Sequence, residues 1–245
     1  MDSQSGKTVN SPPKRVGKRI GLIGGMTWEA TEIYYRLINQ AVQRRLGGMH
    51  SADIVMRSLD FTGPEKLART AQWDAFAALF IEAGRDLETA GAEMLLLCAN
   101  TAHRVAEQVE EALSIPLVHI CDCTAQKIKA DGLKRVVLLG TAYTMEGDFF
   151  KDRLRARGID VFVPDAADRA TIHRVIFEEL VLGNLLEESR QAYREITGRQ
   201  VANGAEGVIL GCTEIPLLIS RGDSAAPLYD TTEIHARAAV ELAFA

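Results

Sequence analysis

Short runs of β-branched and aliphatic residues alternate with longer stretches in which apolar residues recur every three or four positions. The short runs predict buried strands, and the longer stretches predict amphipathic helices. The predicted strands are Ile20–Ile23, Asp53–Leu59, Ala92–Cys98, Leu117–Ile120, Arg135–Leu139, Val161–Val163 and Gly207–Leu210. The predicted helices are Trp28–Arg45, Trp73–Ala90, Ala102–Leu113, Thr124–Ala130, Glu146–Arg157, Arg169–Leu182, Leu186–Asn203 and Asp230–Phe244. Strict alternation of strands and helices predicts an α/β fold whose parallel sheets carry helices on both faces.

The two halves of the chain resemble each other. Residues 91–101 align with residues 204–214, and residues 19–24 align with residues 135–140. The first alignment pairs Cys98 with Gly211, Ala99 with Cys212, Asn100 with Thr213, and Thr101 with Glu214. Matching strand and loop pieces predict two similar α/β domains, each of which points a strand-end loop at a shared cleft.

Cys212 is the first candidate for chemistry. It follows the buried run 208–210 and precedes the helix-opening pair Ile215-Pro216. A strand end of this kind faces the ligand crevice, where free N–H groups favour an anion. The pKa of the thiol is therefore expected to lie below the free value of about 8.5. The alternative is a buried cysteine that acts as a small hydrophobic residue.

The composition excludes several classes of function. Hydrophobic residues make up 47% and charged residues 25% of the chain, as in ordinary globular proteins. A net charge of −5 argues against nucleic-acid and anionic-membrane partners, and we find no apolar run of about 18 residues that would span a membrane. The 4 cysteines without a secretory signal predict free thiols in the cytoplasm. The polar residues 1–18 are expected to form a disordered tail.

Two further motifs are weak signals. The glycines at 21, 24 and 25 do not have G-x-G-x-x-G spacing, so we expect them to let the backbone approach a small ligand near Thr27 instead of a dinucleotide. Cys121-Asp122-Cys123 lacks the spacing of zinc ligands and predicts structural thiols.

An ordered series of segments extends from about Arg19 to the C-terminus: 20–29, 34–39, 45–52, 100–103, 139–146, 176–180 and 211–216. In this order they resemble the aspartate/glutamate racemase family, above all the branch that acts on L-aspartate and L-glutamate without a cofactor. The resemblance implies two flavodoxin-like, parallel-sheet domains related by pseudo-symmetry, with the active site in the cleft between them. We assign residues 19–120 with 229–245 to the first domain and residues 121–228 to the second.

The resemblance also implies a PLP-independent isomerase that needs no metal, takes a small-molecule amino acid or dicarboxylate, and forms a homodimer. Cofactor-free racemisation needs an acid/base on each face of the α-carbon. The resemblance gives one role to Cys212 and the other to the residue before Asn-Thr. That residue is usually cysteine and sometimes threonine in the family, but here it is Ala99.

Ala99 is therefore the position of a missing acid/base, because a methyl group carries no exchangeable proton. We expect racemisation to be impaired or one-sided. Cys98 is adjacent, but neighbouring strand residues point to opposite faces, so it should face the core. Three explanations stay open: a natural relative with one thiol, an engineered inactive variant, or a loop in which Cys98 or a water takes the role.

The expected substrate contacts are Met26, Thr27, Asn100, Thr101, Thr213 and Glu214, with Arg57 supplying a positive charge. Some aspartate racemases have a lysine for the side-chain carboxylate near residues 181–184, and this chain lacks it. Two alternatives fit a single thiol. One is a decarboxylase of the arylmalonate type, and the other is a non-catalytic binder of a dicarboxylate or amino acid.

Overall fold

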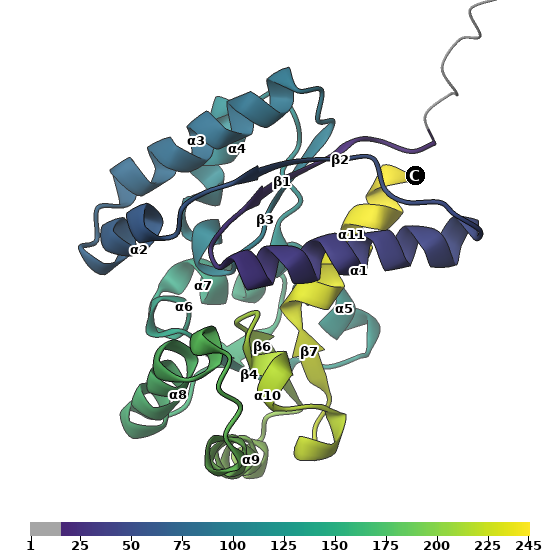
Figure 1. Cartoon of the computed structure of the whole chain (residues 1–245). Helices are drawn as coiled ribbons and strands as arrows, with labels where there is room; N and C mark the ends of the chain where they lie inside the picture. The colour runs from purple at the N-terminus through teal and green to yellow at the C-terminus, as the bar shows by residue number, and fades with distance from the viewer. Residues whose placement is uncertain (1–15) are drawn as a thin grey trace, which may run out of the picture.

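The computed structural model describes residues 16–245, so most of the expected tail lies outside the described residues. Figure 1 shows two layered halves, one above the other, joined by the C-terminal helix. The upper half contains β1 (Ile20–Gly24), α1 (Trp28–Leu46), β2 (Ile54–Ser58), α2 (Thr62–Arg69), α3 (Trp73–Thr89), β3 (Met94–Leu97), η1 (Thr101–Val105) and α4 (Ala106–Ala112).

The lower half is built on a second sheet. Its strands are β4 (Arg135–Gly140), β5 (Asp160–Phe162), β6 (Gly207–Gly211) and β7 (Leu228–Asp230). Its helical segments are α5 (Ile120–Ala130), α6 (Ala142–Glu146), α7 (Asp148–Ala156), α8 (Ala166–Glu178), η2 (Leu180–Leu182), α9 (Glu187–Ala202), α10 (Ile215–Leu218) and η3 (Arg221–Asp223). Helix α11 (Thr231–Ala243) then runs back to the upper half and packs on α1.

Both sheets are parallel and share one topology. Their strand orders are β2-β1-β3 and β5-β4-β6-β7, so the first strand of each half lies between its second and third. This arrangement is that of the flavodoxin-like sheet and confirms the predicted α/β class. The predicted strand Leu117–Ile120 is reduced to one parallel bridge between Leu117 and Leu95, because α5 already begins at Ile120.

The internal repeat is visible in hydrogen bonds. Glu93 accepts a bond from the Arg19 backbone N–H at 2.8 Å, and Glu206 accepts one from the Arg135 N–H at 3.0 Å. Glu93 and Glu206 are paired in the sequence alignment, as are Arg19 and Arg135. The short sequence similarity therefore reflects equivalent strand connections in the two halves.

Alternation along the buried strands decides which residues reach the site. On β3, Leu95 and Leu97 pack with α3 and α4, whereas Leu96 packs with α1 and α11. On β6, Val208 and Leu210 pack with α8 and α9, whereas Ile209 packs with α5 and α7. Each such buried side chain stabilises the fold by about 1.5–3 kcal/mol. Ala99 follows β3 and lies on the same face as Leu95 and Leu97. Cys212 follows β6 and lies on the same face as Val208 and Leu210.

Several element boundaries differ from those predicted. The predicted helix Glu146–Arg157 is two helices, α6 and α7, because Gly147 has an extended backbone with ψ 144°. A Cβ at Gly147 would lie 2.7 Å from the Tyr143 carbonyl oxygen, so this bend requires glycine. Helix α8 ends at Glu178, before the predicted Leu182. The hydrophobic pattern predicts neither α2 nor the three-residue strand β7.

Helix α11 contacts both halves, since the Thr231 hydroxyl at its start donates to the Leu210 carbonyl oxygen of β6 at 2.9 Å. Its His235 accepts a hydrogen bond from the Tyr34 hydroxyl of α1 at 2.8 Å, and its C-terminal Ala243 accepts one from the Lys18 N–H. The division at residues 120/121 and 228/229 stays a proposal. Strand β7, which crosses the second boundary, pairs with β6 of the lower sheet.

Candidate active site

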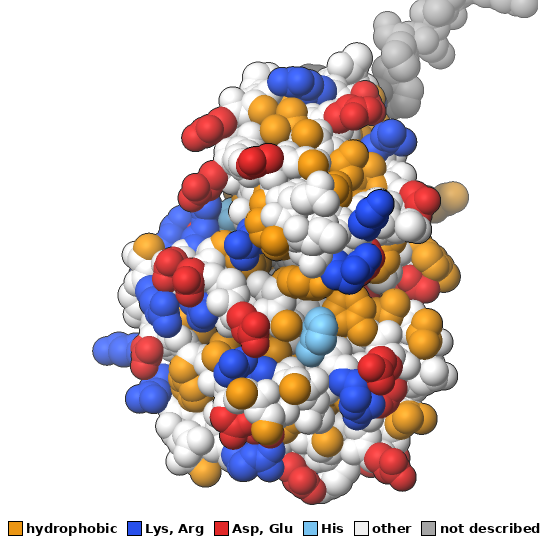
Figure 2. Space-filling model, turned by 90° about the vertical axis from the view of Figure 1, so that its left-hand side faces the viewer, with side chains coloured by type: hydrophobic (Ala, Val, Ile, Leu, Met, Phe, Trp, Pro, Cys, Tyr) orange, Lys and Arg blue, Asp and Glu red, His pale blue; other side chains and the backbone are white. Residues whose placement is uncertain are grey.

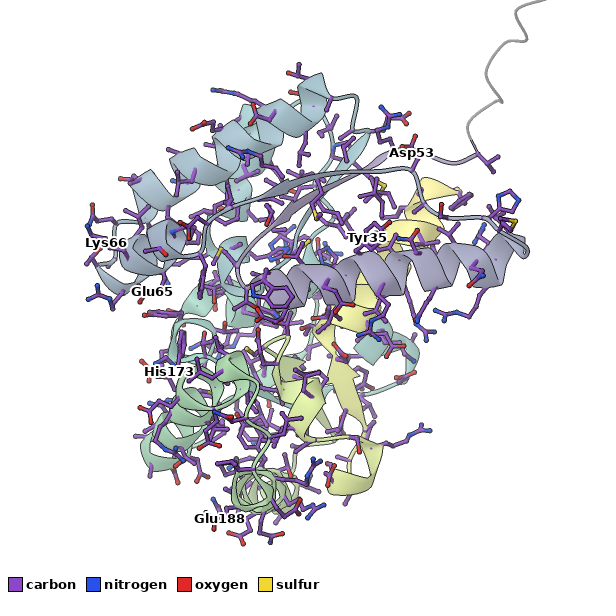
Figure 3. The ribbon with its side chains drawn as sticks, viewed as in Figure 1. Tyr35, Asp53, Glu65, Lys66, His173 and Glu188 are labelled. Atoms are coloured by element: carbon purple, nitrogen blue, oxygen red, sulfur yellow. The ribbon has the colours of Figure 1, made fainter. Side chains whose placement is uncertain are left out.

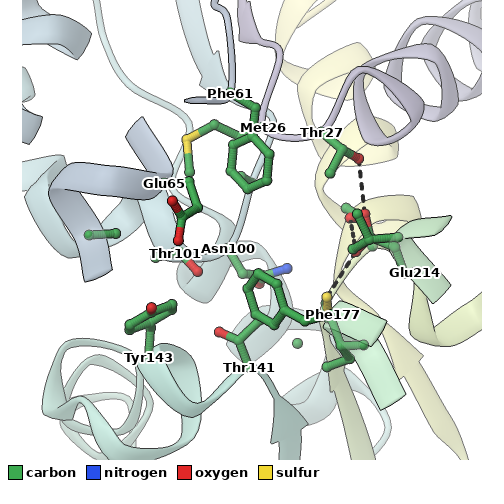
Figure 4. Close-up of a pocket in the computed structure, with 17 residues that line it drawn as sticks. Met26, Thr27, Phe61, Glu65, Asn100, Thr101, Thr141, Tyr143, Phe177 and Glu214 are labelled. Carbon is green, nitrogen blue, oxygen red and sulfur yellow. Dashed lines mark hydrogen bonds between the residues drawn. The ribbon is translucent and has the colours of Figure 1, made fainter. Parts of the chain in front are cut away.

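A pocket lies between the two halves at the C-terminal ends of their central strands. Its cavity volume is about 60 Å³, and the space between its walls is about 600 Å³ when open solvent at the mouth is included. Figure 4 shows the side chains that line it. The sequence-predicted residues in its wall are Met26, Thr27, Ala99, Asn100, Thr101, Cys212, Thr213 and Glu214.

Ala99 and Cys212 hold equivalent positions at the ends of β3 and β6, and each is 8% exposed. Cys98 is 1% exposed and packs on the opposite face of the sheet, with Tyr34 and Ile38 of α1. Its orientation is the one that strand alternation predicts. Cys98 is therefore badly placed to replace the acid/base missing at Ala99.

The buried carboxylate of Glu214 accepts hydrogen bonds from three side chains. The Cys212 thiol donates to Oε2 at 2.9 Å, and the Thr213 hydroxyl donates to the same oxygen at 2.7 Å. Across the cleft, the Thr27 hydroxyl donates to Oε1 at 3.0 Å (Figure 4). Thr27 is also the N-cap of α1, so this carboxylate links the upper half to the sulfur at the end of β6.

The expectation of a lowered thiol pKa at Cys212 is wrong for this structure. Burial raises the pKa of Cys212 well above its ordinary value, and the Glu214 carboxylate raises it further by charge and by accepting the S–H. The backbone N–H groups of Glu214 and Thr213 act in the opposite direction but with less effect. The resting sulfur is therefore a thiol, with a carboxylate already positioned to accept its proton.

Asn100 lines the pocket and contains a buried, unpaired acceptor. Its Nδ2 donates to the Thr231 hydroxyl at 3.1 Å, and that hydroxyl donates to the Leu210 carbonyl oxygen at 2.9 Å. Because the Thr231 proton is directed to Leu210, the Thr231 oxygen must accept from the Asn100 amide, which fixes the amide orientation. Asn100 Oδ1 is buried and has no hydrogen-bond partner within residues 16–245. A buried acceptor of this kind suits the N–H of a bound ligand.

Three buried histidines support the loop that carries Ala99. His103 Nε2 accepts the Ile120 N–H at 3.2 Å, so its Nδ1 must donate to the Ala99 carbonyl, 3.0 Å away. The rings of His119 and His235 contact His103 with centroid separations of 4.7 and 5.5 Å. Burial lowers the pKa of His103 well below its ordinary value, that of His119 to about 2 and that of His235 to about 4. These rings are neutral and structural.

The sequence did not identify the outer wall of the pocket. That wall contains Phe61, Glu65, Ala68, Thr141, Tyr143, Ile176, Phe177 and Val181. Phe61 is the N-cap residue of α2, and Glu65 and Ala68 lie within that helix, whose first-turn residues Pro64 and Glu65 are typical of a helix start. Ile176 and Phe177 come from the end of α8, where helical periodicity cannot distinguish a pocket-facing side chain from a core one.

Arg57 does not line the pocket. Its guanidinium lies 3.3 Å from the Asp86 carboxylate, and both side chains are about half exposed. Its expected role as a substrate cation therefore has no support in the geometry. Within the part of the chain that the structure describes, no group of three or more His, Cys, Asp or Glu is arranged to hold a metal ion.

Comparisons with known proteins agree with the sequence resemblance. The family model described as Asp/Glu/Hydantoin racemase matches residues 23–239. The broad specificity amino-acid racemase RacX of Bacillus subtilis (strain 168) is 24% identical over 222 residues, which cover 90% of this chain and 96% of RacX. A Yersinia pestis crystal structure, assigned provisionally as an Asp/Glu racemase, is 48% identical with a TM-score of 0.89, covering 93% of this chain and 100% of that one. The structure of an aspartate racemase homologue from Pyrococcus horikoshii OT3 is 37% identical with a TM-score of 0.82, and the match covers 92% of this chain and 99% of the homologue.

Proposed function

The chain belongs to the Asp/Glu/hydantoin racemase family, and we propose that it moves the α-proton of an amino acid with Cys212 as its acid/base. Its relative RacX is a broad specificity amino-acid racemase, which is an isomerase, and the Pyrococcus protein is an aspartate racemase homologue. The observation that carries the proposal is the 2.9 Å contact between the Cys212 sulfur and Glu214 Oε2 at the end of β6. A thiol needs a nearby proton acceptor before it can act as a base, and this contact supplies one.

The proposed step conserves protons and charge. Glu214 takes the Cys212 S–H proton, and the resulting thiolate takes the proton from the α-carbon. The electron pair of the broken C–H bond stays on the substrate as a carbanion, which delocalises into the α-carboxylate. Returning a proton from the sulfur to the carbon regenerates the thiolate, and Glu214 then gives its proton back to the sulfur, which restores the resting thiol and carboxylate. The Thr213 and Thr27 hydroxyls keep Glu214 oriented toward the sulfur throughout.

Substrate orientation is assigned to the loop after β3. The unpaired Asn100 Oδ1 is suited to accept an N–H from the substrate ammonium, because Asn100 Nδ2 already donates to Thr231. The Thr101 hydroxyl, which also lines the pocket, is the proposed donor to the α-carboxylate.

Ala99 makes the reaction one-sided in this proposal. Cys212 removes and returns the proton on its own face, and the equivalent position on the other face carries a methyl group. Exchange of the α-proton with solvent should therefore be faster than inversion of configuration.

The test is proton exchange in heavy water with a panel of L-amino acids, followed by NMR. The wild-type protein should exchange the α-proton of at least one amino acid, and Cys212→Ala should lower that rate by about 10²–10⁴. Cys98→Ala is the matched control, because Cys98 packs on the opposite face of the sheet. The proposal is wrong if Cys212→Ala retains the wild-type rate.

The same samples separate the alternatives raised by the sequence. Release of carbon dioxide from an arylmalonate would favour the decarboxylase, and calorimetric binding without exchange would favour a binder.

We also propose a homodimer and a cytoplasmic location. Sedimentation at micromolar concentration that gives only a 26.8 kDa species would exclude the dimer. No helix within the described residues is long and apolar enough to cross a membrane.

A further inference from the structure

A second cavity lies on the surface between α5, the end of α7 and the end of α11. Its volume is about 580 Å³, which is in the usual range for small-molecule sites. It shares no lining residue with the pocket at Cys212. Helix α5 and Glu65 of that pocket lie on opposite sides of the molecule (Figures 1 and 3). We call this cavity the α5 groove, and its polar lining residues are His119, Asp122, Cys123, Gln126, Lys129 and Arg157.

The carboxylate of the α5 groove is already engaged. Asp122 is the one acidic residue among the described residues that line it. Its two oxygens accept from the Arg153 guanidinium at 3.0 and 2.9 Å, and its Oδ2 also lies 2.9 Å from a terminal nitrogen of Arg157. Because two guanidinium groups share this carboxylate, the cluster has a net positive charge.

Helix α5 directs further donors toward the groove. Asp122, Gln126 and Lys129 follow one another at spacings of four and three residues, so they share one face of the helix. The Lys129 ammonium makes no ion pair within residues 16–245. Lys127, on another face, pairs with Asp131 at 2.6 Å. Lys129 is therefore available to a negatively charged ligand, and the Gln126 amide can donate beside it.

His119 supplies a neutral donor at the buried floor of the groove. The residue is 5% exposed, and its Nδ1 accepts the Cys121 N–H at 3.1 Å, so its Nε2 carries the proton. This Nε2–H has no hydrogen-bond partner among the described residues, and solvent reaches it. Burial and the charge of Arg153 lower the pKa of the ring to about 2, so the ring stays neutral. An anion in the groove would pair this donor.

The remaining wall of the α5 groove is apolar. Leu117, Val118 and Ala125 are buried, and Leu242 of α11 is 46% exposed at the edge. Such surfaces suit the hydrocarbon part of a small molecule. Donors and apolar surface side by side therefore favour an organic anion over a bare inorganic one.

Other charged surfaces are less suited to an anion. The cavity that adjoins the groove shares His119 and Arg157 with it but also contains Glu107 and Asp152. The described residues that line the cavity beside Arg44 are all at least partly exposed, so that cavity has no buried donor. Figure 2 shows the face that carries α2 and α8, where acidic and basic side chains are mixed with no field of one sign.

His119 also connects the α5 groove to the loop after β3. Its ring centroid lies 4.7 Å from that of His103. His103 in turn donates from Nδ1 to the Ala99 carbonyl oxygen at 3.0 Å, and its Nε2 accepts the N–H of Ile120, the residue after His119. Contacts between packed side chains are therefore continuous from the groove to the loop that carries Asn100.

We infer that the α5 groove is a second ligand site, which binds a small organic anion. The carboxylate or phosphate group of this ligand accepts hydrogen bonds from Lys129, Arg157 and His119 Nε2, and its hydrocarbon part lies on Leu117 and Leu242. Binding changes the environment of the loop after β3 through the contact between the histidine rings. The inference does not rest on the proposed function, because the groove lies outside the catalytic pocket.

An NMR titration of the whole chain tests the site. The probes are hexanoate and hexyl phosphate, and hexanol is the uncharged control. We expect saturable shifts in the amide resonances of residues 117–129, with a Kd of about 1 mM or tighter for the better anion. Hexanol should bind at least about tenfold more weakly, and the tighter anion identifies the preferred head group. The inference is wrong if hexanol binds as tightly, if neither anion gives saturable shifts, or if the shifts are confined to residues 211–214.

Two lysine substitutions on α5 supply a matched pair. Lys129→Gln removes a charge that lines the groove and should weaken binding of the better anion by at least about fivefold. Lys127→Gln removes the same charge from another face of the helix and should change binding by less than about twofold. Both side chains are exposed, so both variants should keep the wild-type fold. Equal losses of affinity would show a general attraction to the surface and contradict a site in the groove.

The same titration tests the link to the loop after β3. In the wild type, the Asn100 amide resonance should shift with the same Kd as the resonances of α5. In Lys129→Gln, its midpoint should move to higher ligand concentration together with theirs. An Asn100 resonance that stays unchanged while the groove fills would overturn the link.

Discussion

The Cys212 sulfur and Glu214 Oε2 are 2.9 Å apart, and the thiol donates to the carboxylate. The two residues are separated by one position in the sequence, yet Glu214 also accepts a hydrogen bond from Thr27, a residue of the other half of the molecule. The proton acceptor of the thiol is therefore held by both halves. Movement of one half against the other would change the environment of the sulfur.

Replacing Glu214 separates thiol acidity from catalysis. Glu214→Gln removes the negative charge that raises the pKa of Cys212, so the thiolate fraction at pH 8 should increase. Alkylation of Cys212 by iodoacetamide, followed by peptide mass spectrometry, should become roughly tenfold faster for each unit by which the pKa falls. The α-proton exchange rate should nevertheless decrease by about 10²–10⁴, because the acceptor of the thiol proton is lost.

Glu65→Gln is the matched control for that labelling experiment. It removes a carboxylate of the outer wall that pairs with Arg69 instead of the sulfur, and it should leave the alkylation rate of Cys212 unchanged. Faster exchange in Glu214→Gln than in the wild type would rule out Glu214 as the proton acceptor.

The Thr231 hydroxyl connects the Asn100 loop to β6, and removing this hydroxyl should lower the free energy of unfolding. Thr231→Val keeps the shape of the side chain but leaves the Asn100 amide and the Leu210 carbonyl without their partner. Two buried polar groups without partners should lower the free energy of unfolding by about 2–4 kcal/mol. Urea denaturation measures this change, and α-proton exchange should fall with it because Asn100 is no longer held.

The neighbouring residue supplies a control for that substitution. The Thr232 hydroxyl is buried and interacts weakly with the Tyr34 hydroxyl, without a hydrogen bond of good geometry among the described residues. Thr232→Val should therefore change the free energy of unfolding by less than about 1 kcal/mol. Equal effects of the two substitutions would show that the Thr231 hydrogen bonds contribute little.

Much of the fold follows from local pattern. Parallel strands such as β3 and β6 are continuous aliphatic runs because helices cover both of their faces, and this pattern is readable in the sequence. The alignment of Glu93 with Glu206 also predicted that the two halves share a strand arrangement. Short elements were missed because β7 and α2 are too brief to establish a period.

The strand-end residues of the site were predictable, but the pocket wall and its charge were not. Ala99 and Cys212 lie at the ends of recognisable strands, so their position follows from topology. Phe61, Phe177 and Val181 reach the same pocket from separate helical segments, and only the packing of those segments brings them together. The pKa of Cys212 was predicted in the wrong direction, because sequence shows the turn after the strand but not the burial that outweighs it.

The buried histidines should make the protein less stable in acid. The pKa of His235 falls to about 4 in the folded state from an ordinary value of 6.5, and those of His103 and His119 are lowered as well. The unfolded chain therefore binds more protons, so the stabilisation is present above pH 6.5 and is lost as the pH falls toward the folded values. Each ring should cost about 2 kcal/mol between pH 7 and pH 5.

Urea denaturation at several pH values measures that loss. His235→Gln retains a donor and an acceptor without a titrating ring, so its free energy of unfolding should vary less with pH than that of the wild type. His50→Gln, at an exposed loop position, should keep the wild-type pH dependence. A stability that is flat from pH 7 to pH 5 would mean that the histidines are not buried in solution.

The most direct test of one-sided proton transfer compares exchange with inversion in one sample. The wild-type protein and Ala99→Cys are incubated in heavy water with the best amino acid of the panel, and NMR follows deuterium at the α-carbon while chiral chromatography follows the D-isomer. We predict that the wild type incorporates deuterium at least about tenfold faster than it forms the D-isomer. Ala99→Cys should bring the two rates to within about threefold, since a thiol then faces each side of the α-carbon. Equal rates of exchange and inversion in the wild type would contradict the account.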